Sequence, residues 1–270
     1  MAELQPGSPP LRWPAEQLWQ AVVPWLPDFS VEILPEIDSS NTELMRRARA
    51  GRTEPVLLVA EHQTAGRGRM GRQWHSPPGS SLTFSLGLPL APADWSGLSL
   101  AVGVSLAESL AQLAGADVRI KWPNDLWLGA GKLAGILIET AGAGPSRFAV
   151  IGVGINLREP AEQWQPPAGA QGALPAPMPA VAPAWLARTA PVNAQVNALV
   201  NAPIDAPQVL GAVAGSLVHD VLLGRSVQLS DGRSGLACGL SATAALRVQT
   251  PHGIEEVHSG EVSVRPQDWV

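Results

Sequence analysis

A loop that alternates glycine with arginine is the part of the chain best suited to bind a ligand. Residues 66–72 read Gly-Arg-Gly-Arg-Met-Gly-Arg. Glycines let a backbone approach a ligand closely, and arginines present rigid, permanently charged forks that match phosphate or carboxylate. No acidic residue occurs from His62 to Ala93, although the formal net charge of the whole protein is -5. The loop therefore predicts a local anion-binding site.

A second candidate is a pair of lysine-containing blocks further along the chain. Residues 121–125 read Lys-Trp-Pro-Asn-Asp, and residues 131–135 read Gly-Lys-Leu-Ala-Gly at the start of an apolar run. Taken alone, a lysine at a strand end is an ordinary solvated charge, and the Ser39-Ser40-Asn41 run is an ordinary helix cap. The joint occurrence of these blocks with the arginine loop favours a common site.

Two nucleotide-binding motifs are excluded by their context. Gly66-x-Gly68-x-x-Gly71 has the letters of the dinucleotide fingerprint, but it is followed by prolines and a strand where that fingerprint requires a helix. Gly131-Lys132 lacks the Ser or Thr that follows the lysine of a P-loop.

The elements that must position these blocks are strands and helices mixed without regular alternation. Ser40 to Glu43 has the form of a capping box, and Gly51 would end the helix that it opens. Helices are expected at 16–23, 40–50, 98–113 and 205–223; strands are expected at 31–34, 56–60, 81–86, 118–122, 126–128, 133–139, 148–153, 226–229, 234–239, 245–249 and 262–265. The pattern predicts an α+β fold with a mixed, mostly antiparallel sheet.

Composition divides the chain into three expected parts and limits its function. Residues 1–30 form an N-terminal extension with too little helical pattern for a helix-turn-helix domain, residues 31–222 form the main domain with an irregular Pro/Ala-rich stretch at 160–207, and residues 223–270 form a small β domain. The single cysteine excludes an internal disulfide, and we find neither a signal peptide nor a membrane span. We expect a cytoplasmic protein that binds no specific DNA.

Four blocks together resemble the biotin protein ligase family, of the monofunctional type without an N-terminal DNA-binding domain. They are residues 38–41, the loop from Gln63 to Trp74, the lysine blocks from Lys121 to Glu139, and residues 150–156. The resemblance runs from about residue 31 to residue 265. It implies a class II synthetase-like catalytic domain followed by an SH3-like C-terminal barrel.

The resemblance also implies a reaction and its residues. Such ligases join biotin and ATP, with Mg²⁺, into biotinyl-5′-adenylate and pass the biotinyl group to a lysine of a biotin carboxyl carrier protein; a homodimer is left open. By this likeness the catalytic residues are Lys132, Arg67 and Arg69. The biotin-binding residues would be Ser39, Ser40, Asn41, Gln63, Arg67, Gly68, Arg69 and Lys132; the ATP or adenylate residues would be Arg67, Arg69, Trp74, Lys132 and Asn156; the metal ligands would be Asn124 and Asp125.

Three alternatives stay beside this interpretation. A lipoate–protein ligase is similar in fold and also makes an acyl-adenylate. A DNA-binding biotin sensor is disfavoured by the short N-terminal extension. An arginine-glycine RNA-binding segment is disfavoured because the loop occurs once, in an acidic protein.

Overall fold

The fold is described from a computed structural model of the chain. It describes residues 13–24, 26–75, 79–92, 95–114, 117–129, 131–144, 146–157, 220–259 and 264–266. The Pro/Ala-rich stretch at 160–207 and most of the helix expected at 205–223 lie outside these ranges.

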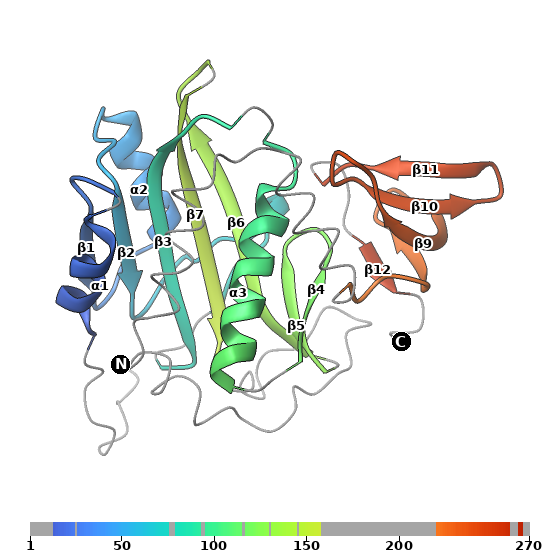
Figure 1. The fold of residues 1–270 in the computed structure, drawn as a ribbon, viewed down its shortest axis with the longest axis horizontal. Coiled ribbons are helices and arrows are strands. Elements are labelled where there is room, and N and C mark those ends of the chain that lie inside the picture. The colour runs from blue at the N-terminus through green and yellow to red at the C-terminus, as the bar shows by residue number, and fades with distance from the viewer. Residues whose placement is uncertain are drawn as a thin grey trace.

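The main domain is built on a seven-stranded sheet (Figure 1). Its strands are β1 (Ser30–Leu34), β2 (Val56–Ala60), β3 (Ser81–Leu90), β4 (Val118–Lys121), β5 (Asp125–Leu128), β6 (Gly131–Ala141) and β7 (Arg147–Asn156). Their spatial order is β1-β2-β3-β7-β6-β5-β4. Only the β1–β2 pair of this sheet is parallel, and its other pairs are antiparallel. The α+β class with a mostly antiparallel sheet is therefore confirmed.

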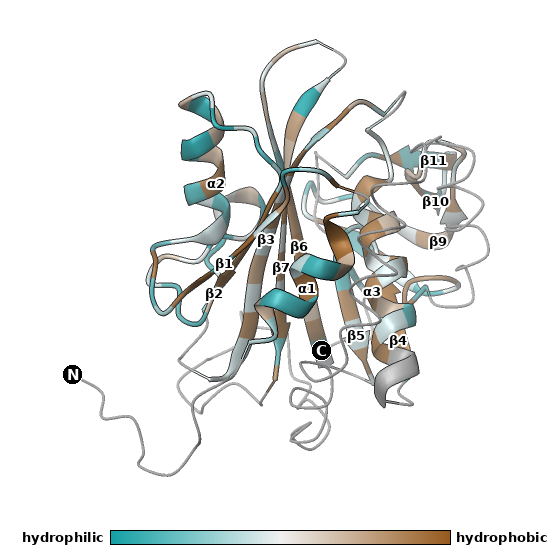
Figure 2. Cartoon of the chain, turned by 60° about the vertical axis from the view of Figure 1, so that its left-hand side comes forward, coloured by the Kyte–Doolittle hydropathy of each residue, from teal (hydrophilic) through white to brown (hydrophobic). Residues whose placement is uncertain are grey.

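Helices cover both faces of this sheet. α3 (Leu98–Ala114) and α1 (Ala15–Val22) pack on one face, where Leu18 and Val22 of α1 join a large apolar core. α2 (Ser40–Arg49) packs on the other face, where Leu44 and Met45 form a smaller core with side chains of β2 and β7. Figure 2 shows the difference in polarity: α3 is largely apolar, whereas α2 turns a hydrophilic side outward.

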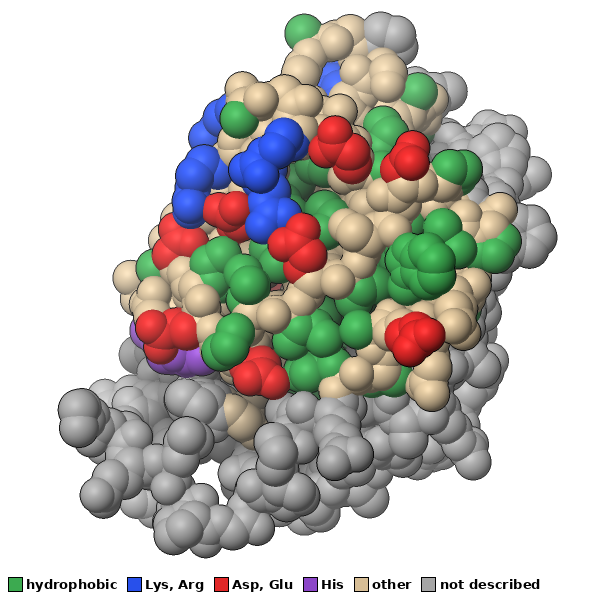
Figure 3. Space-filling model, turned by 90° about the vertical axis from the view of Figure 1, so that its left-hand side faces the viewer, with side chains coloured by type: hydrophobic (Ala, Val, Ile, Leu, Met, Phe, Trp, Pro, Cys, Tyr) green, Lys and Arg blue, Asp and Glu red, His purple; other side chains and the backbone are tan. Residues whose placement is uncertain are grey.

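The outward side of α2 carries balanced charge. Arg46 pairs with Asp38 and Glu43, and Arg47 pairs with Glu32 and again with Glu43. Figure 3 shows basic side chains of this face lying beside acidic ones. These two arginines are therefore neutralised locally.

On the sheet face that α2 covers, the side chains along the strands change from large apolar ones to small or polar ones. Along β7 the positions that face α2 begin with Phe148 and Val150 of the smaller core and continue with Gly152 and Gly154. In β3 the positions opposite these glycines are Ser85 and Thr83. The sheet therefore has a recessed polar floor beside the N-terminus of α2.

The C-terminal residues form a separate five-stranded antiparallel sheet, at the right of Figure 1. Its strands are β8 (Ser226–Leu229), β9 (Ser234–Leu240), β10 (Leu246–Thr250), β11 (Gly253–Val257) and β12 (Val264–Pro266), in the order β11-β10-β9-β8-β12. Its apolar side continues the large core of the main domain, and Trp122 Nε1 donates a hydrogen bond to the carbonyl of Ala244 at 3.1 Å. The two sheets are thus joined by buried contacts.

Three local expectations are corrected. The N-cap of α2 is Ser39, whose Oγ accepts from the backbone N–H of Thr42 at 3.4 Å, so the helix is capped one residue before Ser40 and the predicted capping box from Ser40 to Glu43 is not formed. Strand β11 was not expected, because its sequence Gly-Ile-Glu-Glu-Val directly follows a predicted turn and carries no regular alternation of polar and apolar residues. Residues 220–223 are not the end of a helix: Asp220 forms a parallel bridge with Ile120, and a turn follows.

None of the helices in the described part of the chain has the length and apolar character needed to cross a bilayer.

Candidate active site

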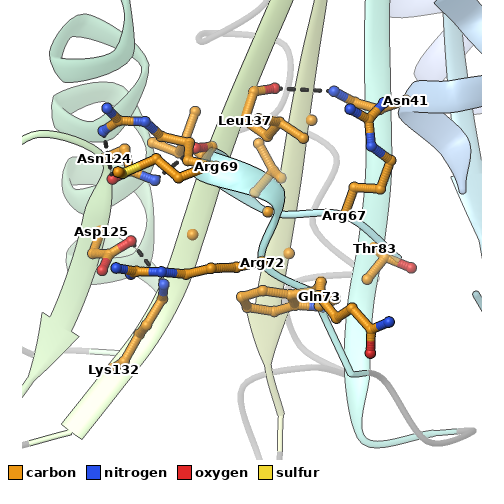
Figure 4. A pocket seen from close by; sticks show the side chains of 18 of the residues that line it. Asn41, Arg67, Arg69, Arg72, Gln73, Thr83, Asn124, Asp125, Lys132 and Leu137 are labelled. Atoms are coloured by element: carbon orange, nitrogen blue, oxygen red, sulfur yellow. Dashed lines mark hydrogen bonds and ion pairs between the residues drawn. The ribbon is translucent and has the colours of Figure 1, made fainter. Parts of the chain in front are cut away.

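A pocket opens over the recessed floor of the sheet (Figure 4). Its lining comes from the start of α2, the glycine-arginine loop, strands β3 to β7 and the last C-terminal strand. The lining residues that the sequence predicted are Ser39, Ser40, Asn41, Gln63, Arg67, Gly68, Arg69, Trp74, Asn124, Asp125 and Lys132. Residues from four separate sequence blocks thus meet in one cavity.

The glycine-arginine loop is folded into a small hairpin over this pocket. Gly68 N–H donates to the carbonyl of Arg72 at 2.8 Å, and Trp74 N–H donates to that of Gly66 at 2.9 Å. A Cβ at Gly66 would lie 2.5 Å from the carbonyl oxygen of Trp74, so this position requires glycine. Met70 at the tip adopts a positive φ of 56° and is exposed. The hairpin aims its arginines at different ends of the pocket, Arg67 toward Asn41 and the others toward β5 (Figure 4).

One end of the pocket is a network of neutral polar groups. Gln63 Oε1 accepts from the backbone N–H of Ser40 at 2.7 Å and from its hydroxyl at 3.1 Å. Ser85 Oγ lies 2.7 Å from Ser40 Oγ and donates to Asn41 Oδ1 at 2.6 Å. Ser40, Asn41 and Ser85 are all buried. Such a fixed set of donors and acceptors suits a neutral, polar ligand ring and penalises ligands that leave it unpaired.

The other end of the pocket concentrates positive charge around one carboxylate. Lys132 Nζ lies 2.8 Å from Asp125 Oδ1, with the ammonium also 5.6 Å from the ring centroid of Trp74. Arg69 donates to Asn124 Oδ1 at 3.1 Å, and Asn124 in turn donates to the carbonyl of Ile136 at 2.8 Å. Burial lowers the pKa of Arg69 from its ordinary value, while the charge of Asp125 opposes that shift. An anion that enters this end of the pocket therefore meets Lys132 and Arg69, whose positions are fixed by Asp125 and Asn124.

Trp74 lies across two paired glycines of the floor. Gly135 and Gly154 are register partners of β6 and β7, and a Cβ at Gly154 would lie 2.5 Å from Trp74 Cε2. The indole Nε1 is buried without a hydrogen-bond partner in the structure. The glycines therefore make room for the indole, which lines the pocket over the floor of the sheet.

Asn156, predicted to contact the nucleotide, is not among the lining residues. It supports the site from the neighbouring strand, since Asn156 Nδ2 donates to the backbone carbonyl of Lys132 at 3.1 Å. Gly68, predicted to meet the ligand through its backbone, lines the pocket but uses its N–H within the hairpin.

Sequence reasoning missed Ser85, which bonds the lining residues Ser40 and Asn41 from beneath, and it missed several lining residues. Ser85 carried no local signal, because a single serine in a strand is common. Arg72 and Arg265 also line the cationic side, and Arg265 comes from β12, far away in the sequence. Lys121 was visible in its block but was not assigned a role. Lys121 and Lys132 are the only lysines of the sequence, and both line this pocket.

Lys121 is held in an unfavourable environment for its charge. The pKa of Lys121 is lowered to about 8, mainly by burial; Asp125 opposes this shift, and the nearby cations Lys132, Arg265 and Arg72 contribute to it. Its ammonium lies 5.4 Å from the ring centroid of Trp127.

The residues proposed for a metal fit Mg²⁺ only in part. The described residues hold no group of three or more His, Cys, Asp or Glu side chains that could enclose an ion. Asp125 offers a carboxylate facing the pocket, whereas Asn124 Oδ1 is engaged by Arg69. Mg²⁺ commonly takes one or two carboxylates together with phosphate and water oxygens. Asp125 fits that role, and Asn124 in this geometry does not.

Comparison with known proteins identifies the domain that carries this pocket. Residues 34–156 match the model of the biotin/lipoate A/B protein ligase family. This region of the chain is similar to that family. It contributes all of the pocket lining except the two residues from β12.

Individual relatives agree with the match. Over 131 residues the chain is 47% identical to the bifunctional ligase/repressor BirA of Escherichia coli, covering 47% of this chain and 40% of that protein. It is 39% identical over 145 residues to the biotin--[acetyl-CoA-carboxylase] ligase of Mycobacterium tuberculosis, covering 51% of this chain and 53% of that protein. The aligned part thus spans about half the length of these curated relatives, or less.

A solved structure matches over a longer range. The biotin protein ligase from Aquifex aeolicus in complex with biotin and ATP is similar with a TM-score of 0.64 and 26% identity, covering 88% of this chain and 99% of that chain. The likeness therefore extends beyond residues 34–156.

Proposed function

We propose that this protein is an ATP-dependent biotin–protein ligase. It would join biotin and ATP to biotinyl-5′-adenylate, release pyrophosphate, and then transfer the biotinyl group to a lysine of a biotin carboxyl carrier protein. The observation that carries the proposal is the single pocket that joins a neutral hydrogen-bonding end, around Asn41 and Gln63, to a cationic end, around Lys132. Biotin has the matching form, with a ureido ring at one end and a carboxylate at the other.

In the first step, a biotin carboxylate oxygen would attack the α-phosphate of ATP, and pyrophosphate would leave. The two reacting groups are both anionic, so held cations must offset their repulsion and fix the geometry. Lys132 is suited to this because Asp125 holds its ammonium at 2.8 Å, and Arg69 reaches the same side from the loop. Mg²⁺, when bound, would neutralise phosphate charge with Asp125 as a ligand.

In the second step, the neutral amine of the acceptor lysine would attack the acyl carbon, and AMP would leave. The hairpin from Gly66 to Trp74 and the indole of Trp74 lie over the floor where this intermediate would sit. A covered intermediate is protected from water until the acceptor arrives.

We extend the proposal to the organisation of the chain. Residues 31–222 would be the catalytic domain and residues 223–270 an SH3-like domain. Two observations support this division: the C-terminal residues form their own five-stranded antiparallel sheet, and Arg265 from that sheet lines the pocket. The C-terminal domain would thus complete the site rather than act as a tether.

Titration calorimetry with biotin and with lipoate tests the substrate class. We expect biotin to bind and lipoate to bind at least about a hundredfold more weakly, because lipoate leaves the polar end unpaired. Biotin-dependent release of pyrophosphate and labelling of a carrier protein then test the two steps. Preference for lipoate, or no heat with either ligand together with no pyrophosphate release, would refute the proposal.

A further inference from the structure

Glu139 connects two parts of the site that come from different elements, Asn41 of α2 and Arg67 of the hairpin. It is on β6, opposite Val150 of β7, on the face of the sheet that α2 covers. Its side chain is 21% exposed. Glu139 Oε2 accepts from Asn41 Nδ2 at 3.1 Å, and Glu139 Oε1 lies 3.1 Å from Arg67 Nη1.

The first partner, Asn41, has its amide orientation fixed by these contacts. Its Nδ2 donates to Glu139 and to the carbonyl of Leu137 at 3.2 Å, so its Oδ1 is directed to Ser85 at 2.6 Å. A Cβ on Gly152 would overlap Asn41 Oδ1, which shows how closely the amide lies on the floor of the sheet. A reversed amide would place an oxygen against the Glu139 carboxylate, and such a contact is repulsive.

The second partner, Arg67, belongs to the hairpin over the pocket. Its side chain is 50% exposed, and its backbone is joined to the rest of the hairpin by an isolated bridge with Gln73. The ion pair with Glu139 therefore ties the hairpin to the sheet at the end of the pocket where Asn41 lies. Arg67 still has further N–H groups with which to meet a ligand anion.

We infer that Glu139 is a positioning residue that couples the hairpin to the polar end of the pocket, holding Arg67 above the cavity and Asn41 in its ligand-binding orientation. The ligand is named biotin on the strength of the proposed function. The coupling itself is a property of the empty protein. An ion pair this exposed contributes little to global stability, so its removal should act on the pocket and not on the fold.

The experiment compares Glu139→Gln with Glu32→Gln. Glu32 is a matched control, because it also pairs with an arginine of the α2 face, Arg47 Nη1 at 2.7 Å, and does not line the pocket. A glutamine at 139 keeps the shape but loses the charge and one acceptor. We expect Glu139→Gln to raise the biotin Kd about tenfold and to speed amide hydrogen exchange in residues 64–75, with the KM for ATP and the melting temperature close to wild type. Glu32→Gln should change none of these.

The double variant with Arg67→Ala tests the coupling. If Glu139 acts through Arg67, Glu139→Gln should cause little further increase in the amide exchange of residues 64–75 when Arg67 is already replaced by alanine. Unchanged biotin affinity and exchange in Glu139→Gln, or fully multiplicative effects in the double variant, overturn the inference. So does a melting temperature that falls together with faster exchange throughout the sheet, since that marks a merely structural role.

These outcomes are separable from failure of the proposed function. If the wild-type protein does not bind biotin, the ligase proposal fails. The exchange of residues 64–75 in the empty proteins then still decides whether Glu139 holds the hairpin.

Discussion

Replacing Lys132 by alanine should remove catalysis and leave the fold intact. In the structure the Lys132 side chain is 39% exposed, and its ammonium pairs with Asp125 at 2.8 Å. A pair this accessible is worth at most about 1 kcal/mol of folding free energy, or about 2 to 4 °C in melting temperature for a chain of this size. A charge contact at the reacting centre is worth about 3 to 4 kcal/mol, which lowers the rate roughly a hundred- to a thousandfold.

The assay is pyrophosphate release with saturating biotin and ATP, together with a melting curve. Arg119→Ala is the matched control: Arg119 Nη2 forms an equally close pair with Asp117 at 2.7 Å, and it does not line the pocket. The control should retain wild-type turnover. Near-normal turnover of Lys132→Ala with a normal melting curve would refute the assignment, because Lys132 would then be only a surface charge.

Three further predictions follow from the same geometry. Arg69→Ala, which loses a cation of the adenylate end, should release the intermediate early and label lysines of bystander proteins; streptavidin blots that show no more bystander labelling than wild type would contradict this. Amide exchange across Thr64–His75 should slow when biotin is added, because a bound anion offsets the repulsion among the loop arginines; equal exchange with and without saturating biotin would count against gating by the loop. For Lys121 the folded pKa of about 8 lies below the unfolded value of 10.5, so the unfolded state binds more protons between these values. Stability should therefore rise with pH from about 8 to 10.5, by at most about 3 kcal/mol, and denaturant titrations of Lys121→Met should lack this rise.

Much of the fold could be predicted from local patterns. In β3 the apolar residues alternate with Ser, Thr and Gly, and this alternation already separates a core face from a polar face. The boundary of α2 was displaced by one residue because Ser39 and Ser40 are equally good caps by type. Local sequence cannot choose between two such neighbours; their tertiary partners do, since Ser40 is engaged by Gln63.

The candidate site was predictable where residue types are rare in combination, as in the glycine-arginine loop and the lysine blocks. It was not predictable where a common residue type gains its role from a distant partner. Ser85 becomes part of the polar end only because β3 lies beneath Asn41. Arg265 reaches the cationic end only because the C-terminal sheet packs against the main domain. The residues that flank Ser85 and Arg265 in the sequence do not indicate either of these contacts.

The confinement of both lysines to the pocket has a chemical consequence. An acyl-adenylate reacts with amines, and a ligase of this kind makes one within reach of its own side chains. The other cationic side chains of this sequence are arginines and histidines, and a guanidinium is a poor nucleophile because it stays protonated. Under the proposed function, stray acylation of the protein at lysine would therefore be confined to the cavity where the reagent is made. For the same reason, an amine-selective reagent applied to the purified protein would report, through its lysine adducts, on the occupancy of this one cavity.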